Sequence, residues 1–264
     1  MSKLIVFVTC QRAGSSISSE IFYQHGMSLG SFDMFGASPE NPRGFCEAMP
    51  IFHINHELHQ IVYGFKEDAI PYVEAGRIMK ERNDIPLDIK ALTTEIIDRG
   101  IETINRLTDG VSIAGFKHPA TVLFWTYWQH VFSQFPHLEI IPVFLSRPPT
   151  GIAASYARRA KRPQVQNNMF DLIEVYLKRM RSIYDSWNSN KPIIRFIDEY
   201  YKDDLKVAIE NCGLVWNEEI FERCYKPSVT VRVVDPIDHP VQSLYDQFST
   251  RTPVSSPTVT GIAK

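Results

Sequence analysis

A short polar loop, residues 11–16 (QRAGSS), follows the first apolar run of the chain, Leu4–Val8. The apolar run predicts a buried strand, and apolar residues spaced four apart after the loop predict a helix. The first turn of a helix leaves backbone N–H groups free and carries the positive end of the helix dipole. Arg12 adds a formal charge, and Ser15 and Ser16 add hydroxyl donors. These residues therefore predict a binding site for a phosphate-like anion.

The loop lacks the lysine of a loop that holds a magnesium-bound triphosphate. The pattern for such a loop, G-x-x-x-x-G-K-[ST], places that lysine beside a metal-binding hydroxyl. No lysine lies between Lys3 and Lys66 in this chain. The loop is therefore suited to a phosphate group without a metal. The plainer alternative is an ordinary strand–helix turn capped by serine.

A second anion signal lies in residues 140–159. A buried strand is predicted to end just before Arg147, two prolines start a helix, and Ser155 stands on its second turn. In a parallel sheet the carboxyl ends of the strands share one edge, where ligands collect. Arg147 is therefore expected near the first loop, unless it pairs with a carboxylate instead. Two anion sites on one edge suit a nucleotide with phosphates at both ends.

These two signals, in this order, resemble the loops of sulfotransferases that use 3′-phosphoadenosine 5′-phosphosulfate (PAPS). In that family a loop of the form [PQ]-[KR]-[SA]-G-[ST]-[ST] binds the 5′-phosphosulfate. A later arginine at a strand end and a helix serine bind the 3′-phosphate. The resemblance implies a 5′ site formed by Arg12, Ala13, Gly14, Ser15 and Ser16, and a 3′ site formed by Arg147 and Ser155.

Two shorter signatures extend the resemblance over residues 3 to about 230. Bacterial-type members carry N-P-x-G-[YF]-x-E and K-[DH]-P, and this chain has NPRGFCE at 41–47 and KHP at 117–119. The segment 193–225 is also similar. The chain departs from the family at Ala13, where serine or proline is usual, and at 118–120 (HPA), where Asp-Pro-Arg is common.

The resemblance implies transfer of a sulfuryl group from PAPS, the co-substrate, to a hydroxyl or amine, with no metal required. Charge that builds on the departing phosphate would be stabilised by Arg12, Lys117 and the helix N-terminus. A hydroxyl acceptor needs a general base. Glu47 and His118 are both candidates for that role, and the sequence does not choose between them.

Buried strands that alternate with helices predict an α/β fold with three layers, α/β/α, around a central parallel sheet. The resemblance makes this a P-loop-like nucleotide-transferase fold. One domain is expected over residues 1–234, with an extension over 235–264 whose end is a disordered tail. Residues 34–45 and 63–88 are expected to form loops. Strands are predicted at Leu4–Val8, Val111–Phe116, Ile140–Leu145 and Ile193–Ile197, and helices at Ile89–Leu107, Ala120–Phe135, Asn168–Trp187 and Asp203–Asn211.

Composition narrows the possible partners. The 264 residues carry a net charge of −2, which argues against a general nucleic-acid binder or membrane-surface binder. No apolar stretch is long enough to cross a bilayer, and the cysteines show no CxxC spacing, so a reduced cytoplasmic compartment is expected. His53, His56 and His59 stand three apart and so spread around a helix, which disfavours a metal site.

The acceptor is not identified by the sequence. A small molecule, a carbohydrate or a lipid remains possible, and six aromatic residues either line an acceptor site or pack in the core. Two other functions remain open: a small-molecule kinase, and a non-catalytic nucleotide-binding protein. The aromatic residues are Phe22, Tyr23, Phe45, Phe52, Tyr63 and Phe65.

Overall fold

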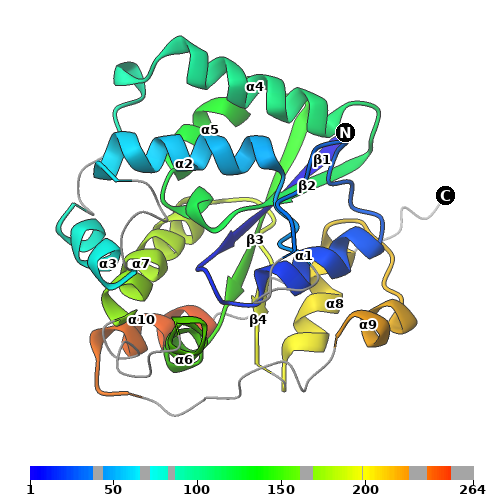
Figure 1. Cartoon of the computed structure of the whole chain (residues 1–264). Helices are drawn as coiled ribbons and strands as arrows, with labels where there is room; N and C mark the ends of the chain where they lie inside the picture. The colour runs from blue at the N-terminus through cyan, green and yellow to red at the C-terminus, as the bar shows by residue number, and fades with distance from the viewer. Residues whose placement is uncertain are drawn as a thin grey trace.

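Four parallel strands form one sheet in the order β2-β1-β3-β4 (Figure 1). The computed structural model describes residues 1–37, 44–65, 72–82, 87–160, 169–197, 199–225 and 237–250. The strands are β1 (Ser2–Thr9), β2 (Ile113–Lys117), β3 (Leu138–Ser146) and β4 (Ile193–Arg195). All four match strands predicted from apolar runs, and the predicted α/β class with a central parallel sheet is confirmed.

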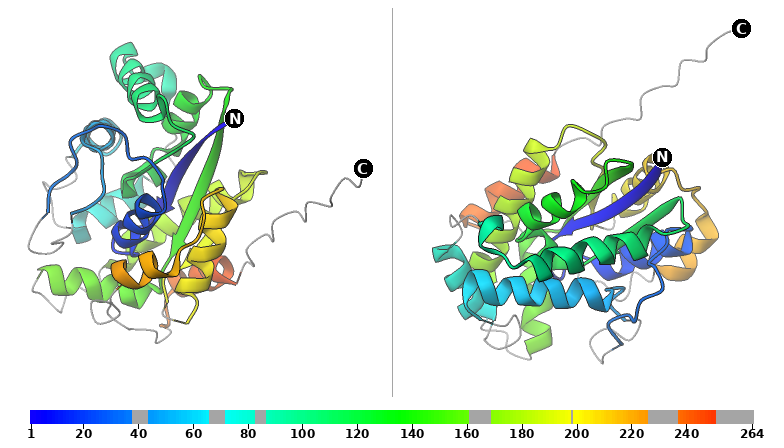
Figure 2. Two further views of the ribbon diagram at one scale, coloured as in Figure 1. Left: turned by 90° about the vertical axis from the view of Figure 1, so that its right-hand side faces the viewer. Right: turned by 90° about the horizontal axis from the view of Figure 1, so that it is seen from above.

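Helices cover both faces of the sheet, and Figure 2 shows the fold from two further sides. One face packs on α1 (Ser15–Gln24), α8 (Tyr201–Asn211) and α9 (Glu218–Cys224). The other face packs on a larger group of helices, which makes the three layers. That group is α2 (Met49–Tyr63), α3 (Tyr72–Glu81), α4 (Thr94–Thr108), α5 (Trp125–Phe132), α6 (Pro149–Ala160), α7 (Phe170–Ser186) and α10 (Pro240–Ser249), with the short helices η1 (Ile89–Ala91) and η2 (Pro119–Val122).

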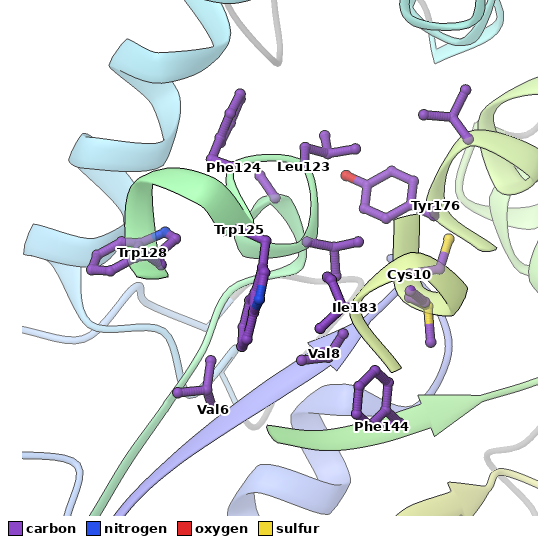
Figure 3. Packing of buried hydrophobic residues seen from close by; sticks show 14 of the residues in the cluster. Val6, Val8, Cys10, Leu123, Phe124, Trp125, Trp128, Phe144, Tyr176 and Ile183 are labelled. Atoms are coloured by element: carbon purple, nitrogen blue, oxygen red, sulfur yellow. The ribbon is translucent and has the colours of Figure 1, made fainter. Parts of the chain in front are cut away.

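The central strand β1 shows why its sequence is apolar throughout. Successive side chains of a strand point to opposite faces, and both faces of this sheet are buried. Val6 and Val8 pack in the core of the larger helix group, against Trp125 and Ile183 among others (Figure 3). Phe7 packs in the second core and meets the edge of the Phe22 ring.

Two predicted helices are each divided in the structure. The periodic stretch from Ile89 begins as η1, passes through extended backbone at Leu92 and Thr93, and continues as α4. The stretch from Ala120 likewise begins as η2 and continues as α5. Apolar residues keep their helical spacing across both breaks, because short turns preserve which side faces the core.

One segment differs from expectation. Residues 63–88, expected to be a loop, contain α3, whose residues Ala75 and Met79 are buried. The extension after residue 234 contains α10, which buries Val241 and Phe248 in the core of the main domain. The position of the boundary at 234 and the tail 251–264 lie outside the described residues.

Candidate functional site

The loop between β1 and α1 turns sharply at two residues with left-handed backbone. Arg12 has a φ of 64° and Gly14, the N-cap of α1, has a φ of 88°. A Cβ at Gly14 would lie 2.5 Å from the ring of Phe196, which follows β4. Only glycine meets both conditions, because it tolerates positive φ and needs no space for a side chain. Arg12 and Gly14 thus turn the chain from the end of β1 into the first turn of α1.

Arg12 and the second motif meet at this loop. Arg12 Nε donates to the Oγ of Ser155, on α6, at 3.1 Å. Arg147 Nη1 donates to the backbone oxygen of Arg12 at 2.8 Å. The guanidinium of Arg147 also lies 5.5 Å from the centre of the Phe196 ring, and Arg147 is only 7% exposed. The structure therefore brings the two sequence motifs together at the carboxyl edge of the sheet.

Two contacts that sequence analysis missed hold the same loop. Tyr156 OH donates to Gln11 Oε1 at 2.8 Å, next to the Arg12–Ser155 bond. Ser18 Oγ lies 2.9 Å from Tyr201 OH and donates to the carbonyl of Gly14 at 3.1 Å. Neither pair belongs to a short motif. The only sequence signal is that Tyr156 adjoins Ser155 on α6.

Lys117 ends β2 and is buried, with 1% of its surface exposed. It pairs with Phe7 across the sheet, which places it on the face that α1 covers. Its Nζ forms an ion pair with Glu47 Oε1 and donates to Ser16 Oγ at 3.3 Å. Lys117 is therefore not a surface lysine at a strand end. It links the 11–16 loop to a carboxylate.

Glu47 lies just before α2, outside the first turn of that helix. Its backbone oxygen accepts from Phe35 N at 2.7 Å, and an isolated bridge joins Met34 to Ala48. These contacts fix the segment that carries the carboxylate into the site, where Glu47 is 7% exposed. The first residues of its signature, 41–43, lie outside the described residues.

His118 is the third member of this cluster. Its Nε2 lies 4.0 Å from Glu47 Oε2, and the Phe52 ring meets it edge-on at 5.7 Å between ring centres. Burial lowers the pKa of His118 to about 4, since the charged form would lose its hydration there. Its Nδ1 has no hydrogen-bond partner among the described residues. His118 is therefore neutral near pH 7.

The three histidines of α2 point in different directions. His53 is exposed, whereas His59 is buried beside Tyr63 and Phe124. Burial lowers the pKa of His59 to about 3. Within the described part of the chain, no three His, Cys, Asp or Glu residues come together as metal ligands.

The aromatic residues considered for an acceptor site fall into separate environments. Phe22 packs in the core and Tyr23 is half exposed, so neither belongs to the site. Phe45 and Phe52 both contact Phe35, and Phe52 reaches His118. Tyr63 and Phe65 pack around His59. Of the six residues considered, Phe45 and Phe52 thus belong, with Phe35, to an aromatic group that reaches the Glu47–Lys117–His118 cluster.

The other sequence-predicted site residues lie around the loop. Ala13 is fully buried, Ser15 is 6% exposed and Ser155 is 2% exposed. Arg158, of the basic run after Ser155, is exposed. The side chain of Arg159 and the residues 161–162 lie outside the described part of the chain.

Comparison with known proteins gives similarity in structure only. No protein-family profile and no curated protein sequence matches the chain. One similar solved structure is the sulfotransferase domain from the Synechococcus PCC 7002 olefin synthase, with 14% identity, a TM-score of 0.49, and coverage of 97% of this chain and 90% of that one. Another is the sulfotransferase domain from the curacin biosynthetic pathway, with 13% identity, a TM-score of 0.48, and coverage of 98% and 94%. No helix among the described residues is long and apolar enough to cross a membrane.

Proposed function

We propose that this chain is a sulfotransferase that moves a sulfuryl group from PAPS to a hydroxyl or amine of a small-molecule, carbohydrate or lipid acceptor. The observation that carries the proposal is the meeting of Arg12, Arg147 and Ser155 around the N-terminus of α1. Two basic side chains beside free helical N–H groups suit a nucleotide with phosphates at two positions. All four cysteines are free, which supports a reducing, cytoplasmic compartment.

The donor set fits a phosphosulfate and needs no metal from the protein. The N-terminus of α1, Arg12 and Ser16 would hold the 5′ group, and Arg147 with Ser155 the 3′-phosphate. PAPS, when bound, supplies an activated sulfuryl group. During transfer, negative charge grows on the oxygen that leaves with the phosphate. Lys117, whose Nζ is 3.3 Å from Ser16 Oγ, is placed to stabilise that charge.

We assign the proton-accepting role to Glu47. Its carboxylate is the one anionic base in the cluster with Lys117 and His118. His118 remains the second candidate, since its ring is neutral near pH 7 and one ring nitrogen lies 4.0 Å from the carboxylate. Glu47 is preferred because it is the member of the cluster that contacts both Lys117 and His118.

The variant Glu47→Gln tests this assignment. It should lower turnover of PAPS about 10²–10⁴-fold, the usual loss on removal of a general base. Turnover is measured as release of adenosine 3′,5′-bisphosphate (PAP) across a panel of phenol, sugar and lipid alcohols. Glu57→Gln is the matched control, because Glu57 pairs with Arg99 at the surface of α2. Full activity of Glu47→Gln together with an inactive His118→Ala would move the role to His118.

The absence of a metal requirement separates this proposal from a kinase. PAP should raise the melting temperature as much in EDTA as in magnesium, and ATP should raise it less. A shift that disappears in EDTA would point to a magnesium-dependent kinase. Binding of PAP without turnover of PAPS on any acceptor would point to a non-catalytic nucleotide-binding protein.

A further inference from the structure

Lys117 is shared between the anion loop and the proposed base. Its ammonium donates to Ser16 Oγ in the first turn of α1 and forms the ion pair with Glu47 Oε1. Lys117 is 1% exposed and Glu47 is 7% exposed, so water screens this pair little. A change in the charge of one partner therefore changes the electrostatic energy of the other.

We propose that Lys117 acts as a switch that makes Glu47 available as a base only when an anion occupies the 11–16 loop. The inference rests on the proposed function. Lys117 neutralises Glu47 before the donor binds. An anionic 5′ group beside Ser16 then takes over the charge of Lys117, and the carboxylate of Glu47 is left without its full counter-ion.

The surrounding charges favour this exchange. Among the described residues, the ionisable groups in contact with Glu47 are Lys117 and His118 on the β2 side, and the neighbouring Cys46 is influenced by Lys117 and by Glu20 on α1. Of these, Lys117 carries the positive charge, because burial keeps His118 neutral. Burial likewise raises the pKa of the Cys46 thiol, so Cys46 adds no charge. A buried carboxylate binds a proton more readily when an added anion shares its counter-ion.

The switch orders the chemical steps. With the donor bound, Glu47 takes the proton of the acceptor hydroxyl, and the acceptor oxygen forms a bond to sulfur. The bond from sulfur to the bridging oxygen breaks, and its electron pair stays on the phosphate of PAP. When PAP leaves, Lys117 pairs with Glu47 again and the proton passes to solvent. Glu47 is thereby held inactive until a donor is present.

Proton uptake on ligand binding tests the switch in the intact chain. PAP is titrated by calorimetry at pH 8 in Tris and in HEPES, whose ionisation enthalpies differ, so that the heats report the protons exchanged. At this pH the phosphates of free PAP are fully ionised. We expect wild-type protein to take up roughly 0.3 of a proton or more per PAP bound. Adenosine 3′-monophosphate, which has no 5′ anion for the loop, should bind without uptake.

Variants identify the group that takes up the proton. In Glu47→Gln the uptake should vanish, whereas His118→Asn and the surface control Glu57→Gln should retain it. Removal of Glu47 should also strengthen PAP binding about 3- to 10-fold, because the carboxylate no longer competes for Lys117. Binding of PAP by wild type without uptake, or equal uptake in Glu47→Gln, would overturn the switch and leave the sulfotransferase proposal standing. Failure of wild type to bind PAP would instead overturn the proposed function.

Discussion

The position of Gly14 makes two demands that no other type of amino acid meets. Its φ is positive, and the Phe196 ring occupies the space where a Cβ would stand. Gly110 also has a positive φ, of 67°, but nothing lies within 4 Å of its Cβ position. Substitutions at these two glycines therefore distinguish the effect of backbone strain from the effect of steric conflict.

Gly14→Ala should destabilise the fold by about 2–4 kcal/mol and weaken PAP binding at least tenfold, because Phe196 and the loop must both move. Gly110→Ala should cost only about 1 kcal/mol and leave PAP binding unchanged. Urea unfolding and calorimetric titration measure both effects. Equal losses of stability in the two variants would mean that Phe196 can yield without cost.

Sequence spacing pointed to Arg12 and Arg147 but not to the network that joins them. Arg12 and Arg147 were predictable, because each follows an apolar run and precedes a helix. The ion pair of Lys117 with Glu47 joins residues 70 positions apart, and the hydrogen bond from Arg12 to Ser155 joins residues 143 positions apart. Such pairings depend on how α2 and α6 pack on the sheet, which a single sequence does not encode in any local pattern.

At the scale of the helix, α2 carries an ionisable group in an apolar environment. His59 is 2% exposed, and neither ring nitrogen has a hydrogen-bond partner within the described ranges. Because burial lowers its pKa to about 3, the unfolded chain binds a proton below pH 6.5 that the folded chain does not. The free energy of unfolding must therefore fall as the pH drops from 7 toward 4.

His59→Leu should remove this loss. Between pH 6 and 4, the free energy of unfolding of the variant should fall with pH less steeply than that of wild type. The two slopes should differ by about 1.4 kcal/mol per pH unit. At pH 7 the variant should be at least as stable as wild type, since a buried unpaired polar group is replaced by an apolar one. His53→Leu, on the exposed side of the same helix, is the control and should leave the slope unchanged. Urea titrations from pH 4 to 8 provide the comparison, and parallel profiles for wild type and His59→Leu would contradict it.

The strands were more predictable than the helices. Each strand is a continuous apolar run, because a parallel sheet is covered on both faces. The short helix α3 was missed, since few of its side chains are buried, Ala75 and Met79 among them. The breaks between η1 and α4 and between η2 and α5 were missed because the apolar spacing continues through them.

At the scale of the whole molecule, α10 packs into the larger hydrophobic core. Phe248 of α10 is 1% exposed and contacts the rings of Phe144 on β3 and Tyr184 on α7. The helix also contacts α6, which carries Ser155 and Tyr156. α10 thereby supports α6, the helix that contacts the 11–16 loop.

Phe248→Ala should lower the free energy of unfolding by about 3–5 kcal/mol, the usual cost of deleting a buried phenylalanine ring. The control Val215→Ala, at a position 83% exposed, should change it by less than about 0.5 kcal/mol. Denaturant unfolding distinguishes the two. A loss below 1 kcal/mol for Phe248→Ala would show that α10 is dispensable to the core.

The central claim is that the site recognises a nucleotide by both of its phosphates without a metal. Calorimetric titration of PAP and of adenosine 5′-monophosphate in EDTA, into wild type and Arg147→Ala, tests it most directly. Arg158→Ala, exposed on the same helix as Ser155, is the control. Wild type should prefer PAP strongly, and Arg147→Ala should weaken PAP about 10- to 150-fold, the scale of a charged hydrogen bond. Adenosine 5′-monophosphate should lose much less affinity. Its small loss arises because Arg147 also holds the 11–16 loop through its hydrogen bond to the Arg12 carbonyl. No preference for PAP in wild type, or equal losses for both ligands, would contradict the account.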